Sequence, residues 1–210
     1  MGLFAFAALC MGVLGSTELA AHQIALQIVS TAFMVPTGLS YAVTMRVGLY
    51  YGAGNLLAAR SAGRVGIGFG ATVMFTFAAL FLLLPEALVS LFIDRNDPGF
   101  AAIYQLAVHL LMVAAWFELF DGMQTIAMGS IRGLKDAKTT FLIGLCCYWL
   151  VGAPSAWLLA FNLGGGAVGI WWGLALGLAC AAVALTFGFE WRMKRLLRKA
   201  GVGEEATASA

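Results

Sequence analysis

The chain has 210 residues, of which 62% are hydrophobic and only 10% charged, with a formal net charge of +2. Soluble domains are about 45–50% apolar and about 25% charged, so this composition excludes a soluble enzyme, a nucleic-acid-binding domain and a disordered chain. Alternating ten-residue segments, which are typical of a transmembrane barrel, are not visible, and an all-α integral membrane protein is therefore predicted.

Six apolar stretches predict six transmembrane helices, because about 20 apolar residues cross the hydrocarbon core. Each is separated from the next by Gly, Pro, Asn or charged residues, which are typical helix-stop signals. The stretches cover about residues 2–14, 20–52, 63–85, 99–129, 139–161 and 166–190. They would form one unit over residues 1–195, followed by a disordered tail over 196–210, where no apolar period continues.

The first stretch is too short to cross a membrane. About 13 residues rise roughly 20 Å, against a hydrocarbon core of about 30 Å. We therefore expect Met1 to lie inside a spanning helix, and the chain to be a fragment of a longer protein.

The basic residues predict the orientation. If the six stretches alternate in direction, every Lys and Arg except Arg95 falls on the same side of the membrane. The positive-inside rule assigns that side to the cytoplasm, together with both termini. This predicts a multi-pass protein of the cell membrane, and specifically of a bacterial inner membrane.

Two carboxylates in the fourth stretch are the residues most indicative of function. Glu118 and Asp121 are three residues apart and share roughly one helix face, with Gln124 a further turn along. Asp121 lies 11 residues before Arg132, which places it about 16 Å deeper. An ionised carboxylate at that depth costs several kcal/mol unless it takes up a proton, binds a cation or faces water.

Asp121 and Glu118 are accordingly predicted to couple transport to a cation, with Asp121 as the place for Na⁺. Two close carboxylates also raise each other's proton affinity, which suits H⁺ as the coupling ion equally well. The alternative is that both acids lie near the helix end and face cytoplasmic water. No Cys/His cluster with metal spacing occurs in the sequence, so Na⁺ or H⁺ would be the only cofactor.

Further residues are predicted to line a substrate cavity or to bend a helix. The predicted lining residues are Gln124, Gln27, Ser30, Phe117 and Met34. The alternative for the polar residues is hydrogen bonding between helices, and for the apolar ones ordinary packing or contact with lipid. Pro36 interrupts an apolar stretch and predicts a hinge, with a static kink as the alternative. His22 is expected at the outer boundary of its helix, as a capping or interface residue.

Three linked segments of this sequence resemble the multidrug and toxic compound extrusion (MATE) family. They are residues 15–25, residues 33–39 followed by 44–48 and 52–54, and the run Phe120-Asp121-Gly122-Met123-Gln124 leading to residues 129–136. The resemblance implies one six-helix lobe, the C-terminal one, of a twelve-helix transporter with a central cleft. It also implies exchange of external Na⁺ or H⁺ for organic, often cationic, small molecules.

The resemblance also implies roles for individual residues. Asp121 matches the acid that the family uses for cation coupling in this lobe, and Gln124 matches a neighbouring position, whereas Glu118 stands where an amide is expected. The family commonly has a further acid early in its seventh helix, just before the matching start of this sequence. The predicted partners are the lipid bilayer and either a missing N-terminal lobe or a second copy, with no nucleic acid.

Two other functions fit the same helices. One is a non-transporting membrane structural or assembly subunit, in which the buried acids serve only helix pairing. The other is a lipid-linked sugar flippase of related architecture, which would want a basic central cavity. An intramembrane enzyme is not supported, because the sequence shows neither a His/Cys/Asp cluster nor a Ser/Lys pair.

Overall fold

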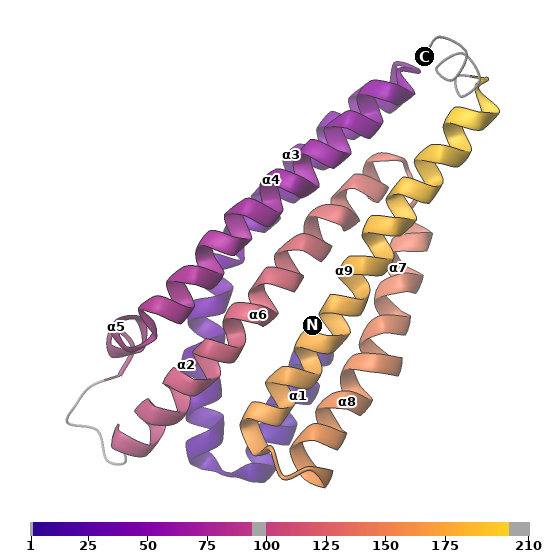
Figure 1. Cartoon of the computed structure of the whole chain (residues 1–210). Helices are drawn as coiled ribbons and strands as arrows, with labels where there is room; N and C mark the ends of the chain where they lie inside the picture. Colours follow the sequence, from indigo (N-terminus) through magenta and orange to yellow (C-terminus); the bar gives the residue numbers. More distant parts are fainter. Residues whose placement is uncertain (1, 94–99, 202–210) are drawn as a thin grey trace.

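The computed structural model describes residues 2–93 and 100–201, and this part of the chain is a bundle of helices without strands (Figure 1). Arg95 and the end of the predicted tail lie outside the described residues. The α-helices are α1 (Gly2–Leu14), α2 (Ser16–Ala32), α3 (Met34–Gly52), α4 (Leu56–Leu83), α5 (Pro85–Ser90), α6 (Phe100–Gly133), α7 (Ala137–Cys146), α8 (Ala153–Trp157) and α9 (Gly166–Lys199), and the π-helical turns are η1 (Cys147–Gly152) and η2 (Leu158–Asn162).

The helices follow the predicted apolar stretches, with some corrections at their ends. Among the described residues, five segments are long and apolar enough to cross a membrane: Ser16–Gly52, Leu56–Leu83, Phe100–Gly133, Ala137–Asn162 and Gly166–Lys199. A shorter apolar helix precedes them. The all-α membrane fold is thus confirmed. Helix α9 continues to Lys199, so the predicted tail begins later than residue 196.

The second stretch is one span with a local break. Helix α2 ends at Ala32, Phe33 forms a turn, and α3 begins at Met34. Pro36 lies in the first turn of α3 and has no N–H to donate to the carbonyl of Ala32, four residues back. The Thr37 hydroxyl donates to the Phe33 carbonyl at 2.8 Å. The break therefore lies where the sequence predicts a hinge.

The fifth stretch also contains a proline, and the chain accommodates it differently. Pro154 lies in the single α-helical turn α8, between the π-helical turns η1 and η2. A π turn shifts the backbone hydrogen bonds by one residue, which is a known way to absorb a missing N–H without breaking the helix. The span from Ala137 to Asn162 thus remains continuous.

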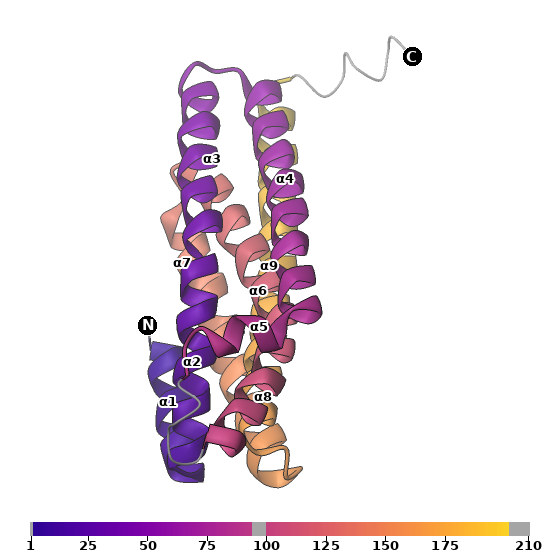
Figure 2. The ribbon, with the colours of Figure 1, turned by 90° about the vertical axis from the view of Figure 1, so that its left-hand side faces the viewer.

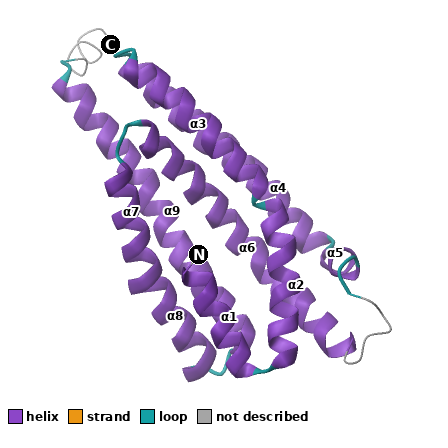
Figure 3. Ribbon diagram, turned by 180° about the vertical axis from the view of Figure 1, so that it is seen from behind, coloured by secondary structure: helices purple, strands orange, loops and turns teal. Residues whose placement is uncertain are grey.

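Helix α6 is the central helix of the bundle. It packs against α2, α3, α4 and α9, and it lies between α3 and α9 in two opposite views (Figures 1 and 3). At its contact with α3, hydroxyl groups of α3 donate hydrogen bonds to backbone carbonyls of α6. The Ser40 hydroxyl donates to the Thr125 carbonyl at 2.7 Å, and the Thr44 hydroxyl donates to the Gly129 carbonyl at 3.0 Å. A Cβ on Gly129 would lie 2.6 Å from the Ser40 carbonyl oxygen. This close seam therefore requires a glycine on α6.

A second seam of small residues joins α9 to the segment around α8. Gly169, Gly173 and Gly177 recur every four residues on one face of α9. A Cβ on Gly173 would collide with the backbone of Ala156, and a Cβ on Gly177 would lie 2.7 Å from the Cα of Gly152. Small residues at this spacing let membrane helices approach closely enough for backbone contact.

The basic residues gather at one end of the bundle, which we call the basic end. It comprises the junctions α3–α4 and α6–α7 and the C-terminal part of α9, all toward the top of Figure 1. Glu190 of α9 ties this end to α4, because Arg60 donates to it at 2.7 Å and Arg64 at 2.6 Å. Asp136 at the α6–α7 junction pairs with Arg192 of α9. Glu190 and Asp136 are thus each neutralised by arginine.

Asp136 also caps α7 and offers a test of this end of the bundle. Its carboxylate accepts from the Thr139 hydroxyl at 2.6 Å and from the Thr139 N–H at 3.1 Å. Losing an N-cap costs about 0.5–2 kcal/mol, so we expect Asp136→Ala to lower the free energy of unfolding by that amount. Asp136→Asn keeps a capping oxygen and should cost less. Thermal unfolding in detergent measures both, and equal losses would contradict a capping role.

The same contacts fix the pH dependence expected of Asp136. The hydrogen bond from the Thr139 hydroxyl, together with the Thr139 N–H and Arg192, holds the pKa of the Asp136 carboxyl below its usual value. A lowered folded-state pKa stabilises the protein above the ordinary Asp value, and the contribution is lost as pH falls through the lowered pKa. The difference between wild type and Asp136→Ala should therefore stay constant from about pH 5 to 8 and shrink only in acid.

Candidate functional site

Glu118 and Asp121 lie together on the inner side of α6. Glu118 is fully buried and Asp121 is 7% exposed. Helix α6 contacts helices on several sides, and the face that carries these two acids is buried, whereas Met112 and Trp116 of the same helix are 41% and 45% exposed. The structure therefore contradicts the alternative in which both acids face solvent at the helix end.

Gln124 extends this pair by one turn. Its amide nitrogen donates to the Asp121 carboxylate at 3.3 Å and contacts the hydroxyl of Tyr148, a residue of η1. Gln124 itself is 4% exposed, so the contact between α6 and η1 is closed to solvent. Tyr148 was not predicted from the sequence, since an aromatic residue within an apolar stretch carries no signal of a polar contact. Only the π-helical turn reveals that its hydroxyl points at Gln124.

The site has more hydrogen-bond acceptors than donors. In the part of the chain that the structure describes, both carboxylate oxygens of Glu118 and the amide oxygen of Gln124 are buried without a hydrogen-bond partner. Within that part, neither Glu118 nor Asp121 forms an ion pair with Lys or Arg. Unpaired buried acceptors of this kind are costly, and a proton or a cation removes that cost.

The donor set fits a hard cation better than a transition metal. Carboxylate and amide oxygens are ligands of hard cations, whereas transition metals favour imidazole or thiolate. Among the described residues, no group of three or more His, Cys, Asp or Glu could hold a metal ion. The arrangement can thus take up a proton, or a cation such as Na⁺ through few protein oxygens.

The helices around the pair are packed closely. A Cβ on Gly122, next to Asp121, would collide with the side chain of Met74 and lie 3.4 Å from the Cβ of Pro36. The α2–α3 break is thereby placed against the same turn of α6 as Asp121. A movement at this break would therefore change the packing next to Asp121.

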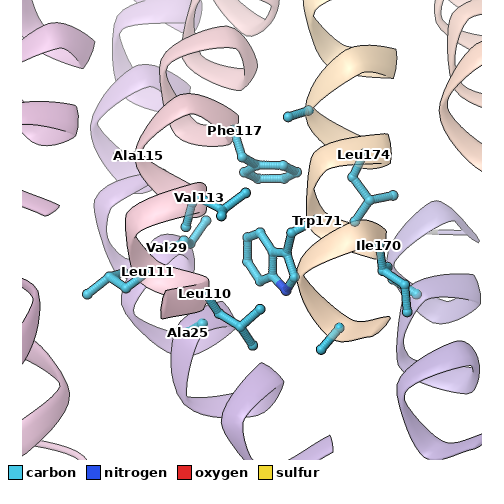
Figure 4. Close-up of a cluster of buried hydrophobic side chains, with 14 of the residues drawn as sticks. Ala25, Val29, Leu110, Leu111, Val113, Ala115, Phe117, Ile170, Trp171 and Leu174 are labelled. Atoms are coloured by element: carbon cyan, nitrogen blue, oxygen red, sulfur yellow. The ribbon is translucent and has the colours of Figure 1, made fainter. Parts of the chain in front are cut away.

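Toward the other end of the bundle, the pair borders an aromatic cluster. Phe117 and Trp171 pack edge to face with ring centroids 5.2 Å apart, and both lie in the buried cluster of Figure 4. The His22 ring also packs edge to face with Trp171, with ring centroids 5.6 Å apart. His22 is fully buried, which corrects the expectation that it is a capping or interface residue. Neither its ring nitrogens nor the Trp171 N–H has a hydrogen-bond partner in the described structure.

Apart from Gln124, the predicted cavity-lining residues do not gather around Asp121. Gln27, Ser30 and Met34 are exposed along one side of α2 and the start of α3. Met34 is 74% exposed, whereas Phe117 is 1% exposed. Phe117 is therefore a core residue in this structure, because it fills the space between α6 and α9 beside Trp171. Of the predicted site residues, the structure unites Glu118, Asp121 and Gln124, with Pro36 nearby.

Comparison with known protein families decides the affiliation. The MatE family model matches residues 1–158, which is most of the chain. The chain belongs to the MATE family. Its members are membrane transporters rather than enzymes. The resemblance seen in the sequence is thus confirmed, and a multi-pass membrane protein is the expected form.

Curated MATE relatives are similar over nearly the whole chain. A probable multidrug resistance protein NorM of Pseudomonas putida is 91% identical over 100% of this chain and 46% of its own length. The probable NorM of Pseudomonas syringae is 67% identical over 97% of the chain and 44% of its own length. The NorM of Burkholderia vietnamiensis is 45% identical over 93% and 42%. The chain thus spans less than half the length of these relatives, which is consistent with one lobe.

Solved MATE structures share the fold. A crystal structure of MATE in the bent conformation superposes with a TM-score of 0.85 at 16% identity, covering 95% of this chain and 43% of that one. An outward-facing multidrug resistance MATE transporter gives a TM-score of 0.83 at 18% identity, covering 93% and 43%. At this identity the likeness establishes the helical arrangement alone.

Proposed function

We propose that this chain forms one lobe of an antiporter that exports drugs and other organic compounds in exchange for Na⁺ or H⁺. One observation carries the proposal: Glu118 and Asp121 are buried in the central helix with carboxylate oxygens that no described group neutralises. The multidrug resistance names of the NorM relatives support organic compounds as the exported class.

The burial of the acids explains how an ion can drive the cycle. An ionised carboxylate inside the membrane costs several kcal/mol, and a bound proton or Na⁺ removes that cost. The pair therefore has an occupied, neutral form that suits the closed packing seen around Gly122 and Met74. Its empty form is charged and favours an arrangement that admits water or an organic cation. Alternation between the two forms couples the ion to the substrate.

The exposed side of α2 and α3 is the proposed place for the substrate. Gln27 and Ser30 offer polar groups there, and Met34 offers an adaptable apolar one. This side would face a second lobe across the cleft. The greater length of the relatives favours an N-terminal lobe as this second lobe. A second copy of this chain is the alternative. Pro36, at the break between the two helices, is the proposed hinge.

The rival functions are weaker on the same observations. A structural subunit with acids serving helix pairing would give Glu118 a partner, but its oxygens have none among the described residues. A carrier of anionic, lipid-linked sugars would favour basic residues at the site. A MOP superfamily transporter from Pyrococcus furiosus, described by a reverse polarity of its binding pocket, shares the fold at a TM-score of 0.74 and 17% identity. The site of the present chain is acidic.

The test needs both lobes. We define the complete transporter as the Pseudomonas putida relative in which this chain replaces the matching part. In proteoliposomes it should move a fluorescent organic cation when a Na⁺ gradient or a pH gradient is imposed, each tested separately. If neither the Na⁺ gradient nor the pH gradient drove movement of the organic cation, antiport would be contradicted. Movement of a lipid-linked sugar analogue in place of the organic cation would favour the flippase. Labelling of the basic end from the cytoplasm is expected, following the positive-inside rule.

A further inference from the structure

A groove between α3 and α4 lies apart from the acidic pair. It has a volume of about 440 Å³ and is lined on α3 by Leu39, Ala42, Val43, Arg46 and Tyr50, and on α4 by Ala58, Ser61, Ala62, Val65, Gly66 and Phe69. The two helices contact each other, lie side by side and are joined at the basic end (Figure 2). Neither Asp121 nor any predicted cavity-lining residue reaches this groove.

Small side chains create the groove. Ala42 of α3 and Ala58, Ser61 and Ala62 of α4 are small lining residues, so the space that larger residues would fill remains open. Deeper in the bundle the helices close on one another, since a Cβ on Gly66 would collide with the side chain of Val43. Val43 is 8% exposed and forms the floor of the groove. On the outer side, Val65 and Phe69 are 67% and 58% exposed, so the groove opens away from the core.

The groove is polar at one end and apolar at the other. Arg46, Tyr50 and Ser61 lie toward the α3–α4 junction, at the basic end, whereas Leu39, Gly66 and Phe69 lie toward the middle of the bundle. On each helix the lining extends over 12 residues, from Leu39 to Tyr50 and from Ala58 to Phe69, or about 16 Å from the first residue to the last. One leaflet of the hydrocarbon core is about 15 Å thick, half of about 30 Å. The groove therefore has the length and polarity of a single lipid chain with its headgroup.

Arg46 determines the charge of that headgroup. It is the one charged residue among those lining the groove, and no carboxylate of the lining opposes it. Its guanidinium lies 5.9 Å from the ring centroid of Tyr50, and it makes no ion pair within residues 2–93 and 100–201. The two arginines of α4 are engaged, because Arg60 and Arg64 both bind Glu190. A free guanidinium beside an apolar groove at membrane level favours an anionic phosphate group.

We propose that the α3–α4 groove binds an anionic glycerophospholipid of the surrounding leaflet, with its phosphate on Arg46 and one acyl chain along Val43 and Phe69. Such a lipid would fill the space left by the small residues and bridge two helices that contact the central helix. This binding is independent of the proposed antiport, since it uses no residue of the acidic pair.

The test is photo-crosslinking in the complete transporter, held in nanodiscs. The probes are phosphatidylglycerol and phosphatidylethanolamine that carry the same photoreactive acyl chain, and labelled peptides are identified by mass spectrometry. We expect labelling within 39–50 and 58–69 to favour phosphatidylglycerol about five-fold, which corresponds to the ~1 kcal/mol expected for one basic residue at an anionic surface.

Two pairs of variants separate the headgroup from the chain. Arg46→Gln should abolish the preference for phosphatidylglycerol, while Arg195→Gln, which removes a basic residue of α9 outside the groove, should keep it. Ala42→Trp fills the groove and should remove labelling by both lipids, whereas Val183→Trp, at a residue of α9 that is 56% exposed, should not. Each variant is first checked for an unchanged elution volume, so that misfolding is recognised.

Several results would overturn the proposal. Equal labelling by both lipids, or a preference for phosphatidylglycerol that survives Arg46→Gln, would contradict recognition of an anionic headgroup by Arg46. Displacement of the lipid by millimolar inorganic phosphate would identify a free ion as the occupant. An unlabelled groove beside labelled lipid-facing residues of α9 would show that the other lobe, or a second copy, covers it. A failure of antiport would leave all these results unaffected.

Discussion

Asp121→Asn should reduce ion-driven export by the complete transporter by about 100-fold or more, equivalent to about 2.7 kcal/mol in the transport barrier. Asparagine keeps the size of the side chain and can still accept a hydrogen bond from Gln124. It cannot take up a proton or attract a cation, however, so the alternation between a charged and a neutral site is lost. The measurement is efflux of a fluorescent organic cation from proteoliposomes under an imposed Na⁺ or pH gradient.

The matched control is Glu86→Gln. It removes one carboxylate in the same way, but Glu86 is an exposed residue of α5, away from the basic end of the bundle (Figure 1). Its transport rate should equal that of wild type. Glu118→Gln should also slow export, because Glu118 is fully buried one turn from Asp121. Wild-type rates in Asp121→Asn, with normal insertion, would remove Asp121 from the coupling mechanism.

The second large effect concerns folding. Gly173→Ala should lower the free energy of unfolding by about 1–3 kcal/mol, because the new methyl group meets the backbone of Ala156, which cannot rotate away. Gly188→Ala makes the same change in the same helix and serves as the control. There the nearest atoms are side-chain carbons of Ile143 and Ile131 at 3.6 and 3.8 Å, an ordinary contact.

Gly188→Ala should therefore be neutral or stabilising by up to about 1 kcal/mol, since alanine is the better helix former. Both variants are compared by thermal unfolding in detergent, followed by the loss of the folded peak in size-exclusion chromatography. Opposite signs for the two alanines are expected. If both alanines stabilised the chain equally, the close approach of α9 to the segment around α8 would be wrong.

Much of this fold could be predicted from the sequence, because hydrocarbon imposes a simple rule on the chain. Long apolar stretches broken by Gly, Pro and charge correspond to the helices, and the spacing of Glu118, Asp121 and Gln124 correctly indicated one shared helix face. The spacing could not indicate that Glu118 and Asp121 are buried. Their burial depends on the central position of α6, which is decided by contacts between distant parts of the chain.

The parts that escaped prediction depend on contacts between distant segments. Tyr148, which contacts Gln124, lies in the π turn Cys147–Gly152, and the sequence pattern carries no signal of that turn. Phe117 was expected at a cavity but is packed against Trp171, a residue 54 positions away in the sequence. His22 was expected at a boundary and is buried for the same reason. In each case the local sequence pattern was compatible with either environment.

The most direct test of the account is a measurement of ion release when substrate binds. The complete transporter in detergent is equilibrated with ²²Na⁺, or with a pH indicator in weak buffer, and an organic cation is then added. Wild type and Glu86→Gln should release Na⁺ or protons as the substrate binds, and Asp121→Asn should release neither. Unchanged release from Asp121→Asn would contradict the claim that the buried carboxylates of α6 hold the coupling ion.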